Sequence, residues 1–580
     1  MTNQNETIEV ASVKTRRNNL KERYQVWQRD TVSSHFQKVC QQYKTQPYLY
    51  IGNNTITYEQ MWQDALLYAR SFKQLGVKRR DHIAVLMNNQ ASYPALMIAA
   101  SIVGAVFIPI NAMLSKKELA YILQQSDAEF LILEQTIKDK HHGAHVSQLL
   151  SEERFIEDSS LHTIICLENE ILKEVSDNFL TWDAFIEKAA LVSTVDIQEV
   201  LKQSIYPDEV AIILYTSGST GHPKGVMLTS DMLLRCAYST CLSRAIEEGR
   251  VTFAPLPFYH CFAIIEAIFA MSFVGGSFIS ALGASPLQSL ELMEKHKAND
   301  YLCVPSMLVP LVNHPQVGEF DLSHLFAAWC GAAPAPVPVW KKAIQTLGLT
   351  EIITGYGQTE VASSGVTTEI GDSLERITTR VGRPKLGGSS GLREFQGSPV
   401  QYKTIDPETL KSLPTGSIGE LVVRGATVTK GYYNKPLETA ETIDKDGWLR
   451  TGDVGRIDVD GYLQVLGRSK EMFKVSGELV APREIENVID EHPAVNQVQV
   501  IGVPDSLTTE IGAAFIELHE NEQISRKEIA DWCAPQLARF KIPRHIWFIK
   551  AADWPMTSTG KIQKFRLQEL AKGKLPTSDT

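Results

Sequence analysis

The chain has 580 residues, enough for several cores of the usual domain size of about 100 to 200 residues. Its 44% hydrophobic and 21% charged residues indicate a soluble globular protein, and a net charge of -10 argues against a nucleic-acid partner. Eight cysteines without a CxxC pair or regular spacing indicate buried thiols in a reducing compartment, so we expect a cytoplasmic protein.

Residues 1–30 are polar, lack the apolar run of a secretory signal, and are expected to form a flexible or docking extension. Residues 94–114 carry no charge and approach the ~20 residues needed to span a bilayer. Gly104 and Pro109 favour another interpretation: a buried helix through about Ile102, a turn at Gly104 and a short core strand. We therefore expect no transmembrane segment, although peripheral membrane contact stays open.

Strand-like and helix-like segments then alternate. Apolar, β-branched runs at residues 82–87, 130–133 and 210–216 predict buried strands, and residues 58–75 and 115–125 have helical spacing. Residues 150–204 are charged and are expected to form peripheral helices. The alternation predicts an α/β fold in which helices cover the sheets.

The stretch "YTSGSTGHPKGVMLTS" (residues 215–230) follows the third predicted strand, on the side of an α/β sheet where ligands bind. It is not a P-loop, because Lys224 follows a proline and Gly225 stands where a magnesium-binding hydroxyl is required. Backbone, hydroxyl and lysine groups for an anion would come from Thr216, Ser217, Gly218, Ser219, Thr220, Gly221 and Lys224. The alternative is an ordinary Gly/Ser turn with a surface lysine.

Three later stretches accompany residues 215–230 in the chain: "GYGQTE" (355–360), "WLRTGDVGRIDVDGYLQVLGRSKEMFKVSGE" (448–478) and "PMTSTGKIQK" (555–564). In this order they resemble the core motifs of the adenylate-forming (AMP-binding) superfamily, in its acyl-CoA synthetase or fatty acid-CoA ligase branch. The resemblance spans residues 31–572. It implies a large N-terminal domain of layered α/β subdomains and a small, mobile α+β C-terminal domain.

The resemblance also implies ATP, Mg²⁺ and coenzyme A as reactants or cofactors. The loop from Thr216 to Lys224 would hold the β- and γ-phosphates, and Thr359 would contact the α-phosphate. Glu360 would bind Mg²⁺, which prefers oxygen ligands. Lys561 would be the catalytic lysine, an ammonium between the incoming carboxylate and the α-phosphate.

For the rest of the nucleotide, the resemblance implies that Tyr356, next to Gly357, lies against the adenine. The segment of Gly331, Ala332 and Ala333 would lie opposite, although relatives often carry a glycine where Ala332 stands. Asp453 and Arg468 would bind the ribose; the alternative for Asp453 is a turn-forming residue after a glycine.

The implied domains are residues 1–30 as an extension, 31–468 as the AMP-binding domain and 469–580 as the mobile domain. Lys470 would be the hinge, and Lys474 and Gly477 would lie along the pantetheine tunnel of CoA. A solvated basic face and a hairpin turn are the alternatives for these residues. Residues 385–408 have no functional interpretation.

The acyl pocket is assigned by the resemblance to Tyr259, His260, Phe262 and Gly355. No carboxylate stands early in this segment, so an amino-acid substrate is disfavoured because its ammonium would be buried without a counter-charge. Residues 263–269 form an apolar wall, on which Glu266 faces either solvent or the pocket.

We therefore expect an ATP-dependent acyl-CoA synthetase acting on a medium- or long-chain fatty acid. The alternatives are an aryl-CoA ligase, a fatty acyl-AMP ligase that serves a carrier protein, and a non-catalytic nucleotide-binding homologue.

Overall fold

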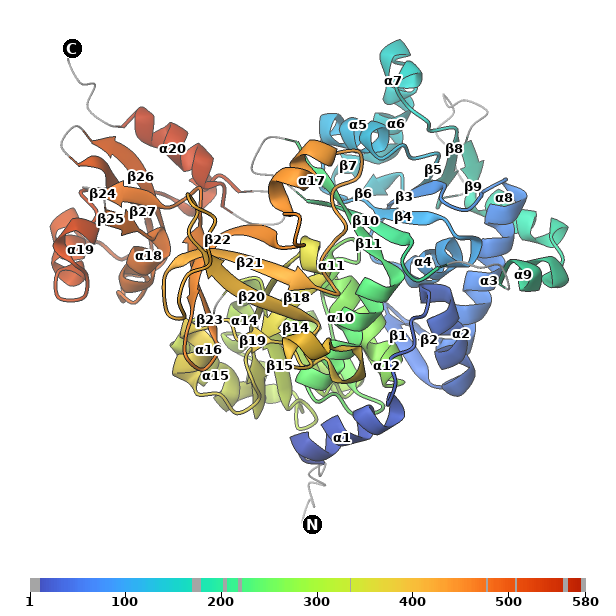
Figure 1. Cartoon of the computed structure of the whole chain (residues 1–580), viewed down its shortest axis with the longest axis horizontal. Helices are drawn as coiled ribbons and strands as arrows, with labels where there is room; N and C mark the ends of the chain where they lie inside the picture. Colours follow the sequence, from blue (N-terminus) through green and yellow to red (C-terminus); the bar gives the residue numbers. More distant parts are fainter. Residues whose placement is uncertain are drawn as a thin grey trace. The chain divides into compact units, whose positions relative to one another are not determined.

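The computed structural model of the chain describes residues 11–168, 179–201, 206–216, 222–333, 335–475, 478–505, 508–556 and 562–574. Its contacts divide the chain into two compact units (Figure 1). The large unit comprises Met1–Tyr402 and Val423–Leu449, and the small unit comprises Lys403–Val422 and Arg450–Thr580.

Two mainly parallel sheets form the large unit, and each ends in one antiparallel strand. The first has the order β16 (Glu351–Ile353), β15 (Ala327–Cys330), β14 (Asp300–Cys303), β12 (Val251–Phe253), β13 (Ser277–Ser280), β1 (Pro47–Ile51) and β2 (Asn54–Thr57). The second has the order β11 (Lys224–Thr229), β10 (Val210–Thr216), β4 (Val106–Pro109), β3 (His82–Leu86), β5 (Phe130–Leu133), β8 (Thr163–Cys166) and β9 (Phe179–Thr181). A smaller sheet has the order β17 (Gly355–Gln358), β18 (Ser363–Thr367) and β19 (Arg383–Pro384), and β6 (Thr136–Ile137) pairs with β7 (Lys140–His141).

Successive strand residues point to opposite faces of a sheet, and both faces of the two large sheets are covered. In β3, Ile83 and Val85 enter the main core, whereas Ala84 and Leu86 enter a second core. The main core joins the facing sides of the two large sheets and contains Tyr48 of β1. The large unit is therefore layered, with helices between the two sheets and outside each of them.

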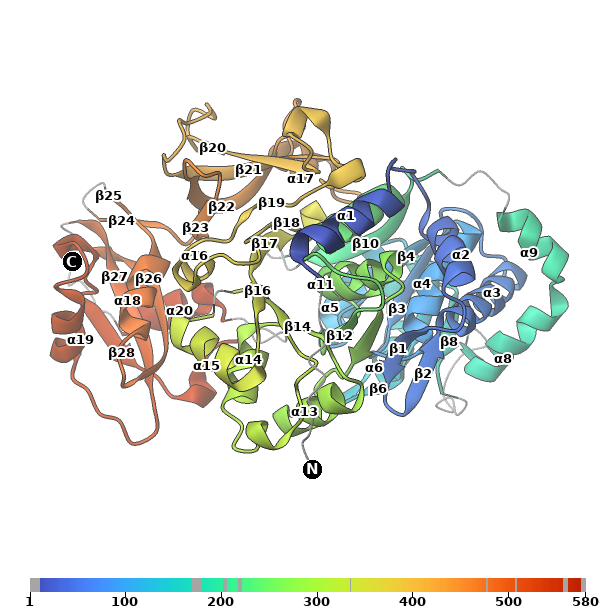
Figure 2. The same ribbon diagram turned by 90° about the horizontal axis from the view of Figure 1, so that it is seen from below.

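The layer between the sheets contains α2 (Val32–Gln42), α3 (Tyr58–Gln74), α4 (Ser92–Val103), α10 (Ser230–Ser243), α11 (Cys261–Ala263), the π-helical turn η2 (Ile264–Phe269) and α12 (Ala270–Phe273). Figures 1 and 2 show α3 and α4 side by side. Outer helices are α5 (Lys116–Gln125), α6 (His142–Leu149), α13 (Pro286–Lys295), α14 (Pro305–Val312) and α15 (Val337–Leu347). Shorter helices are α7 (Glu153–Glu157), α8 (Trp182–Glu187), η1 (Lys188–Leu191), α9 (Thr194–Leu201), η3 (Val317–Glu319), η4 (Thr359–Val361), α16 (Leu374–Thr379), η5 (Gly388–Ser390), η6 (Arg393–Phe395) and α17 (Pro436–Thr442).

The structure confirms the three predicted strands and both predicted helices. Their hydrophobic patterns are local in the sequence, so they could be recognised without knowledge of the tertiary contacts. Within residues 94–114, α4 ends at Gly104, whose φ of 77° is left-handed, and β4 follows. The expectation of peripheral helices for residues 150–204 is wrong in part, because β8 and β9 extend the second sheet there. Among the described helices, none combines the length and apolar character that a membrane span requires.

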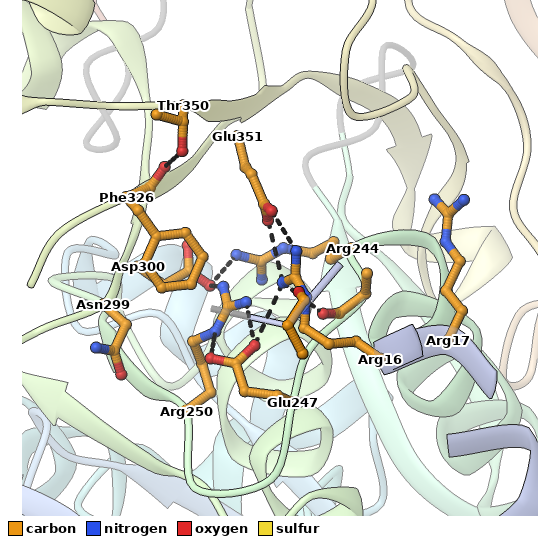
Figure 3. A network of polar contacts seen from close by, with 12 residues as sticks. Arg16, Arg17, Arg244, Glu247, Arg250, Asn299, Asp300, Phe326, Thr350 and Glu351 are labelled. Atoms are coloured by element: carbon orange, nitrogen blue, oxygen red, sulfur yellow. Dashed lines mark hydrogen bonds and ion pairs between the residues drawn. The ribbon is translucent and has the colours of Figure 1, made fainter. Parts of the chain in front are cut away.

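Residues 11–30 are attached to the large unit through α1 (Val13–Arg23) and the segment that follows it. Arg16, only 3% exposed, donates to the carbonyl of Ala245 at 2.8 Å and forms ion pairs with Glu247 and Glu351 (Figure 3). Trp27 Nε1 donates to Asp231 at 2.9 Å. A charged helix with a buried arginine is thus held by carboxylates from distant parts of the chain.

The small unit is α+β. Strands β20 (Val400–Ile405), β21 (Gly419–Gly425), β22 (Leu449–Ile457) and β23 (Leu463–Arg468) form a sheet in that order. The division between the units falls within this sheet, because residues 400–402, 423–425 and 449 belong to the large unit. A second sheet contains β25 (Glu478–Val480), β24 (Phe473–Val475), β27 (Thr509–Leu518) and β26 (Val495–Asp505), with β28 (His545–Phe548) beside β27. Its helices are α18 (Pro482–Asp490), α19 (Arg526–Cys533), η7 (Arg539–Lys541), η8 (Ala551–Asp553) and α20 (Lys564–Lys572).

Candidate active site

Lys224, the cation of the predicted phosphate loop, is the first residue of β11. It pairs with Thr216, the last residue of β10, across an antiparallel ladder. In a P-loop the corresponding lysine starts a helix instead, so the structure agrees with the rejection of that motif. The other predicted loop residues, Ser217, Gly218, Ser219, Thr220 and Gly221, lie outside the described residues.

Tyr432 connects Lys224 with Glu360. Lys224 Nζ lies 4.8 Å from the centroid of the Tyr432 ring, within cation–π range. The hydroxyl of the same tyrosine donates a hydrogen bond of 3.0 Å to Glu360 Oε1. Burial, and then the neighbouring Glu360, raise the pKa of Tyr432, so the phenol stays protonated and remains a donor. A cation and a carboxylate are thus held by one phenol, an arrangement suited to a phosphate group and its metal ion.

The segment around Tyr432 is fixed by backbone hydrogen bonds. Met227 of β11 donates to the carbonyl of Gly431 at 3.1 Å, and Thr429 donates to the carbonyl of Glu360 at 2.7 Å. Residues 429–433 therefore tie the strand that begins with Lys224 to the turn that carries Glu360.

Thr359 begins the short turn η4, directly after β17. Its Oγ1 lies 3.7 Å from Cys261 Sγ, and burial raises the pKa of that thiol to about 12, so the contact is between neutral groups. Gly357 precedes this turn, and a Cβ there would lie 1.8 Å from the carbonyl oxygen of Ser363. Only glycine allows β17 and β18 to approach so closely, which gives the second glycine of "GYGQTE" a structural role.

The predicted adenine-binding residues lie on two strand ends of the large unit. Tyr356 is in β17, with its ring 6.4 Å from that of Tyr402. After β15, Ala333 donates to the carbonyl of Gly331 at 2.8 Å, and Ala332 has a φ of 65°. That left-handed conformation favours glycine, so Ala332 holds a backbone position that suits a glycine better. Adenine binding itself stays a prediction.

Phe262 packs on the buried ring of Trp329 near the Thr359 turn. Their rings meet edge to face at 5.4 Å. A Cβ on Gly331 would lie 2.9 Å from Phe262 Cζ, and one on Gly355 would lie 3.1 Å from Trp329 Cζ2, so these four residues are contiguous. Cys261, which contacts Thr359, immediately precedes Phe262. Trp329 is fully buried and Phe262 is partly exposed, so the Phe262 ring is the apolar group that reaches the surface beside the predicted α-phosphate contact.

The other two predicted pocket residues lie at the start of α11. His260 Nδ1 accepts the backbone N–H of Phe262 at 3.2 Å and so caps the helix. Desolvation lowers the pKa of His260, although part of its side chain is reachable by water. Tyr259 is half-buried, and burial raises the pKa of its phenol. Both groups are therefore uncharged at neutral pH.

The orientation expected for Glu266 is wrong. The side chain faces neither solvent nor a pocket, because it is fully buried and bonded to hydroxyl groups between α10 and β18. The residues from Ile264 to Phe269 are all packed in the main core. Residues 263–269 consequently present no exposed carboxylate at the predicted acyl pocket.

In the small unit, Asp453 and Arg468 are opposite each other on β22 and β23. Arg468 Nε lies 3.0 Å from Asp453 Oδ1, and Arg468 also donates to the carbonyl of Thr451 at 3.2 Å. The predicted ribose-binding pair is thus an ion pair in the structure. Lys470 and Lys474 are exposed on the segment that follows, whereas Gly477 and Lys561 lie outside the described residues.

Sequence reasoning missed Tyr432, Cys261 and Trp329. Tyr432 stands in "KGYYNK", a polar stretch with no periodicity, and its contact with Glu360 spans 72 residues. No sequence motif predicts the contact of Cys261 with Thr359 or the position of Trp329. The signal that could have found Tyr432 is "GYY", a glycine followed by paired tyrosines.

The oxygen donors of this site fit Mg²⁺. Glu360 supplies a carboxylate and Thr359 a hydroxyl, and Mg²⁺ prefers one or two carboxylates together with phosphate oxygens and water. Across the described ranges, no three His, Cys, Asp or Glu side chains gather as a metal cluster.

Comparisons with known proteins agree with this geometry. The family AMP-binding enzyme matches residues 36–433, and the family AMP-binding enzyme C-terminal domain matches residues 484–561. YngI of Bacillus subtilis (strain 168), provisionally named an acyl-CoA synthetase, is 33% identical over 528 residues, covering 89% of this chain and 92% of that protein. The mitochondrial medium-chain acyl-CoA ligase ACSF2 of Danio rerio is 28% identical over 531 residues, or 90% and 84% of the two chains.

Among solved structures, the anthranilate CoA ligase AuaEII in complex with anthranoyl-AMP superimposes with a TM-score of 0.78 at 25% identity, covering 94% of this chain and 98% of that one. The fold is that of adenylate-forming enzymes, with a large N-terminal and a small C-terminal domain. The chain therefore belongs to the AMP-binding enzymes, the adenylate-forming family of acyl-CoA synthetases and ligases.

Proposed function

We propose that this protein is an AMP-forming acyl-CoA synthetase for medium- or long-chain fatty acids. The observation that carries the proposal is the partly exposed ring of Phe262, which packs on the buried Trp329 and lies one residue from the Cys261–Thr359 contact. An alkyl tail can pack against this ring while its carboxylate reaches the turn of Thr359 and Glu360. The medium-chain acid in the name of the Danio rerio relative supports this substrate class.

The first step joins the acid to AMP. A carboxylate oxygen attacks the α-phosphorus of ATP, and pyrophosphate leaves with the electrons of the broken P–O bond. Thr359 and Lys561 bind and orient the reacting groups, and the ammonium of Lys561 offsets the charge that both bring, an effect worth about 10²- to 10³-fold in rate. Lys224 binds the departing phosphates. Mg²⁺ held by Glu360 supplies additional positive charge on the phosphate oxygens when it is bound.

The second step transfers the acyl group. The thiol of coenzyme A loses its proton and attacks the acyl carbon, a thioester bond forms, and AMP leaves with the oxygen that came from the acid. In this step Lys470 acts as the hinge of the small unit, and Lys474 and Gly477 border the path of the pantetheine arm.

Two other reactions use the same site. The aromatic ring of Phe262, with the anthranilate ligase among the structural neighbours, favours an aryl-CoA ligase as the second candidate. A carrier protein ends in the same pantetheine as coenzyme A, so a fatty acyl-AMP ligase is the third.

Pyrophosphate release with a panel of acids, with and without coenzyme A, tests the proposal. We expect acetate to be poor and the rate to rise with chain length, by up to about fourfold per methylene until the pocket is filled, from ~0.8 kcal/mol per buried CH₂. Benzoate or cinnamate acting better than octanoate would favour the aryl ligase. Adenylate formation without thioester would indicate a carrier-protein acceptor, and no pyrophosphate with any acid would contradict catalysis.

A further inference from the structure

A fully buried carboxylate and a fully buried ammonium lie behind the Thr359–Glu360 turn. Glu266, on η2, and Lys385, which follows β19, have side chains that are 0% and 1% exposed, and Lys385 Nζ lies 3.8 Å from Glu266 Oε1. No role for either residue is part of the proposed reaction. Lys385 also begins the segment 385–408, for which the sequence offered no function.

Two hydroxyl groups bridge the charges. Lys385 Nζ donates to Thr240 Oγ1 at 2.6 Å, and Thr240 Oγ1 donates to Glu266 Oε2 at 2.5 Å. Lys385 Nζ also donates to Ser364 Oγ at 2.9 Å, and Ser364 Oγ donates to Glu266 Oε1 at 2.7 Å. Ser364 thus passes a hydrogen bond from the ammonium to the carboxylate, and Thr240 does the same, although the carbonyl of Cys236 lies 3.0 Å from its Oγ1 as a second acceptor.

The carboxylate also holds the end of the catalytic turn. Ser363 Oγ donates to Glu266 Oε1 at 2.9 Å. Ala362 and Ser363 have φ values of 63° and 129°, a conformation that non-glycine residues adopt only when their surroundings impose it. Three residues before Ala362, the same turn contains Thr359, which contacts Cys261 at the other end of the helical segment that carries Glu266.

The segment from Cys261 to Glu266 thus contacts both ends of the turn, through Thr359 and Ser363. Between these contacts the helix widens into the π-helical turn η2, a feature often found at functional sites. A buried ion pair is no better for stability than a well-packed apolar pair of similar volume, so stability alone gives no reason for this one. Its directed hydrogen bonds to Ser363 and Ser364, by contrast, define one position of the turn.

We propose that Glu266 and Lys385 are positioning residues for adenylation. Through Ser363 and Ser364 they hold the strained turn so that Thr359 and Glu360 present their oxygens to the α-phosphate and Mg²⁺. This inference rests on the proposed function of those two residues.

The central test is the double variant Glu266→Met/Lys385→Met, which removes both charges and keeps side chains of similar length. Its thermal midpoint should return close to that of the wild type, above that of Lys385→Met, which leaves a buried carboxylate uncompensated. Its adenylation kcat should nevertheless stay about 10- to 100-fold low, the effect of small misplacement of catalytic groups, and the Mg²⁺ concentration for half-maximal rate should rise. A double variant with wild-type kcat and Mg²⁺ dependence would overturn the proposal.

Arg250→Met is the matched control, because Arg250 is 1% exposed and belongs to a buried ion-pair network with Glu247 and Asp300 (Figure 3). It should lower the thermal midpoint while leaving kcat and Mg²⁺ dependence unchanged at a temperature where the variant is folded. Equal kinetic defects in Arg250→Met and the double variant would show a general loss of packing. Ser363→Ala, which removes one hydrogen bond and no charge, should give a smaller rise in the Mg²⁺ requirement; an unchanged requirement contradicts the proposal.

A readout without turnover separates this inference from the proposed function. Addition of ATP and Mg²⁺ should raise the thermal midpoint of the wild type more than that of the double variant. If ATP and Mg²⁺ raise the thermal midpoint of the wild type more than that of the double variant, but the wild type releases no pyrophosphate with any acid, the proposed function fails and the positioning role stands. If ATP and Mg²⁺ raise both thermal midpoints equally, the positioning role fails.

Discussion

Replacement of Tyr432 by phenylalanine removes the hydroxyl that bonds to Glu360 and interacts with Thr442, and it keeps the ring. The hydroxyl donates to Glu360 Oε1 at 3.0 Å, whereas the ring packs in the main core, 7% exposed, and lies against Lys224. A hydrogen bond to a charged acceptor contributes about 1.5 to 3 kcal/mol. If that bond orients the carboxylate for reaction, its loss should lower kcat/KM for adenylation by about 10- to 100-fold, at ~1.4 kcal/mol per factor of ten.

Tyr433→Phe provides the control, because the hydroxyl of this neighbouring tyrosine donates to Asp127 at 2.9 Å instead of to Glu360. Pyrophosphate release should be measured for both variants over a range of Mg²⁺ concentrations. We expect Tyr432→Phe alone to need more Mg²⁺, with a thermal midpoint close to that of Tyr433→Phe. Identical Mg²⁺ curves for the two variants would refute the role of Tyr432 in orienting Glu360.

Three further perturbations test other parts of the structure. Arg16→Gln should lower the free energy of unfolding by about 3 kcal/mol, the low end for a broken buried ion pair, because the partner carboxylates keep some contact with water. Arg29→Gln, at an exposed arginine, should change the free energy of unfolding by less than about 1 kcal/mol. Equal urea midpoints for the two variants would contradict the anchoring of α1 by Arg16. Burial lowers the pKa of His35 to about 4, below the ~6.5 of an unfolded histidine. The neutral imidazole therefore contributes about 3 kcal/mol to the free energy of unfolding above pH 6.5, and this contribution is lost as the pH falls toward 4. His35→Gln should flatten the stability profile between pH 6.5 and 4, and an unchanged slope would contradict the role of His35. Lys561→Ala should abolish adenylation but spare thioester formation from supplied acyl-adenylate, whereas Gly477→Leu should do the reverse; equal loss of both steps would exclude domain alternation.

Local signals predicted much of the fold. The strands β3, β5 and β10 are runs of buried apolar residues, and α5 begins with a capping box at Ser115, so each could be read within a few residues. The strands β8 and β9 were missed because residues 169–178, between them in the sequence, are mostly polar or charged.

The site was predictable where a residue type and its motif order specify the chemistry. The Asp453–Arg468 pair is adjacent as expected, because the two residues are separated only by a β-hairpin. Tyr432 and Lys385 could not be assigned, since their partners Glu360 and Glu266 come from distant segments that only the folded chain brings together. The helical pattern of residues 263–269 likewise could not show that Glu266 would meet a lysine instead of a ligand.

The origin of the oxygen in AMP tests the central claim most directly. A fatty acid labelled with oxygen-18 in its carboxylate is incubated with the protein, ATP, Mg²⁺ and coenzyme A, and the products are analysed by mass spectrometry. Attack of the carboxylate on the α-phosphorus predicts one oxygen-18 atom in each AMP, unlabelled pyrophosphate and an acyl-CoA thioester. Label in inorganic phosphate, with ADP as the nucleotide product, would mean attack at the γ-phosphorus and would contradict an AMP-forming synthetase.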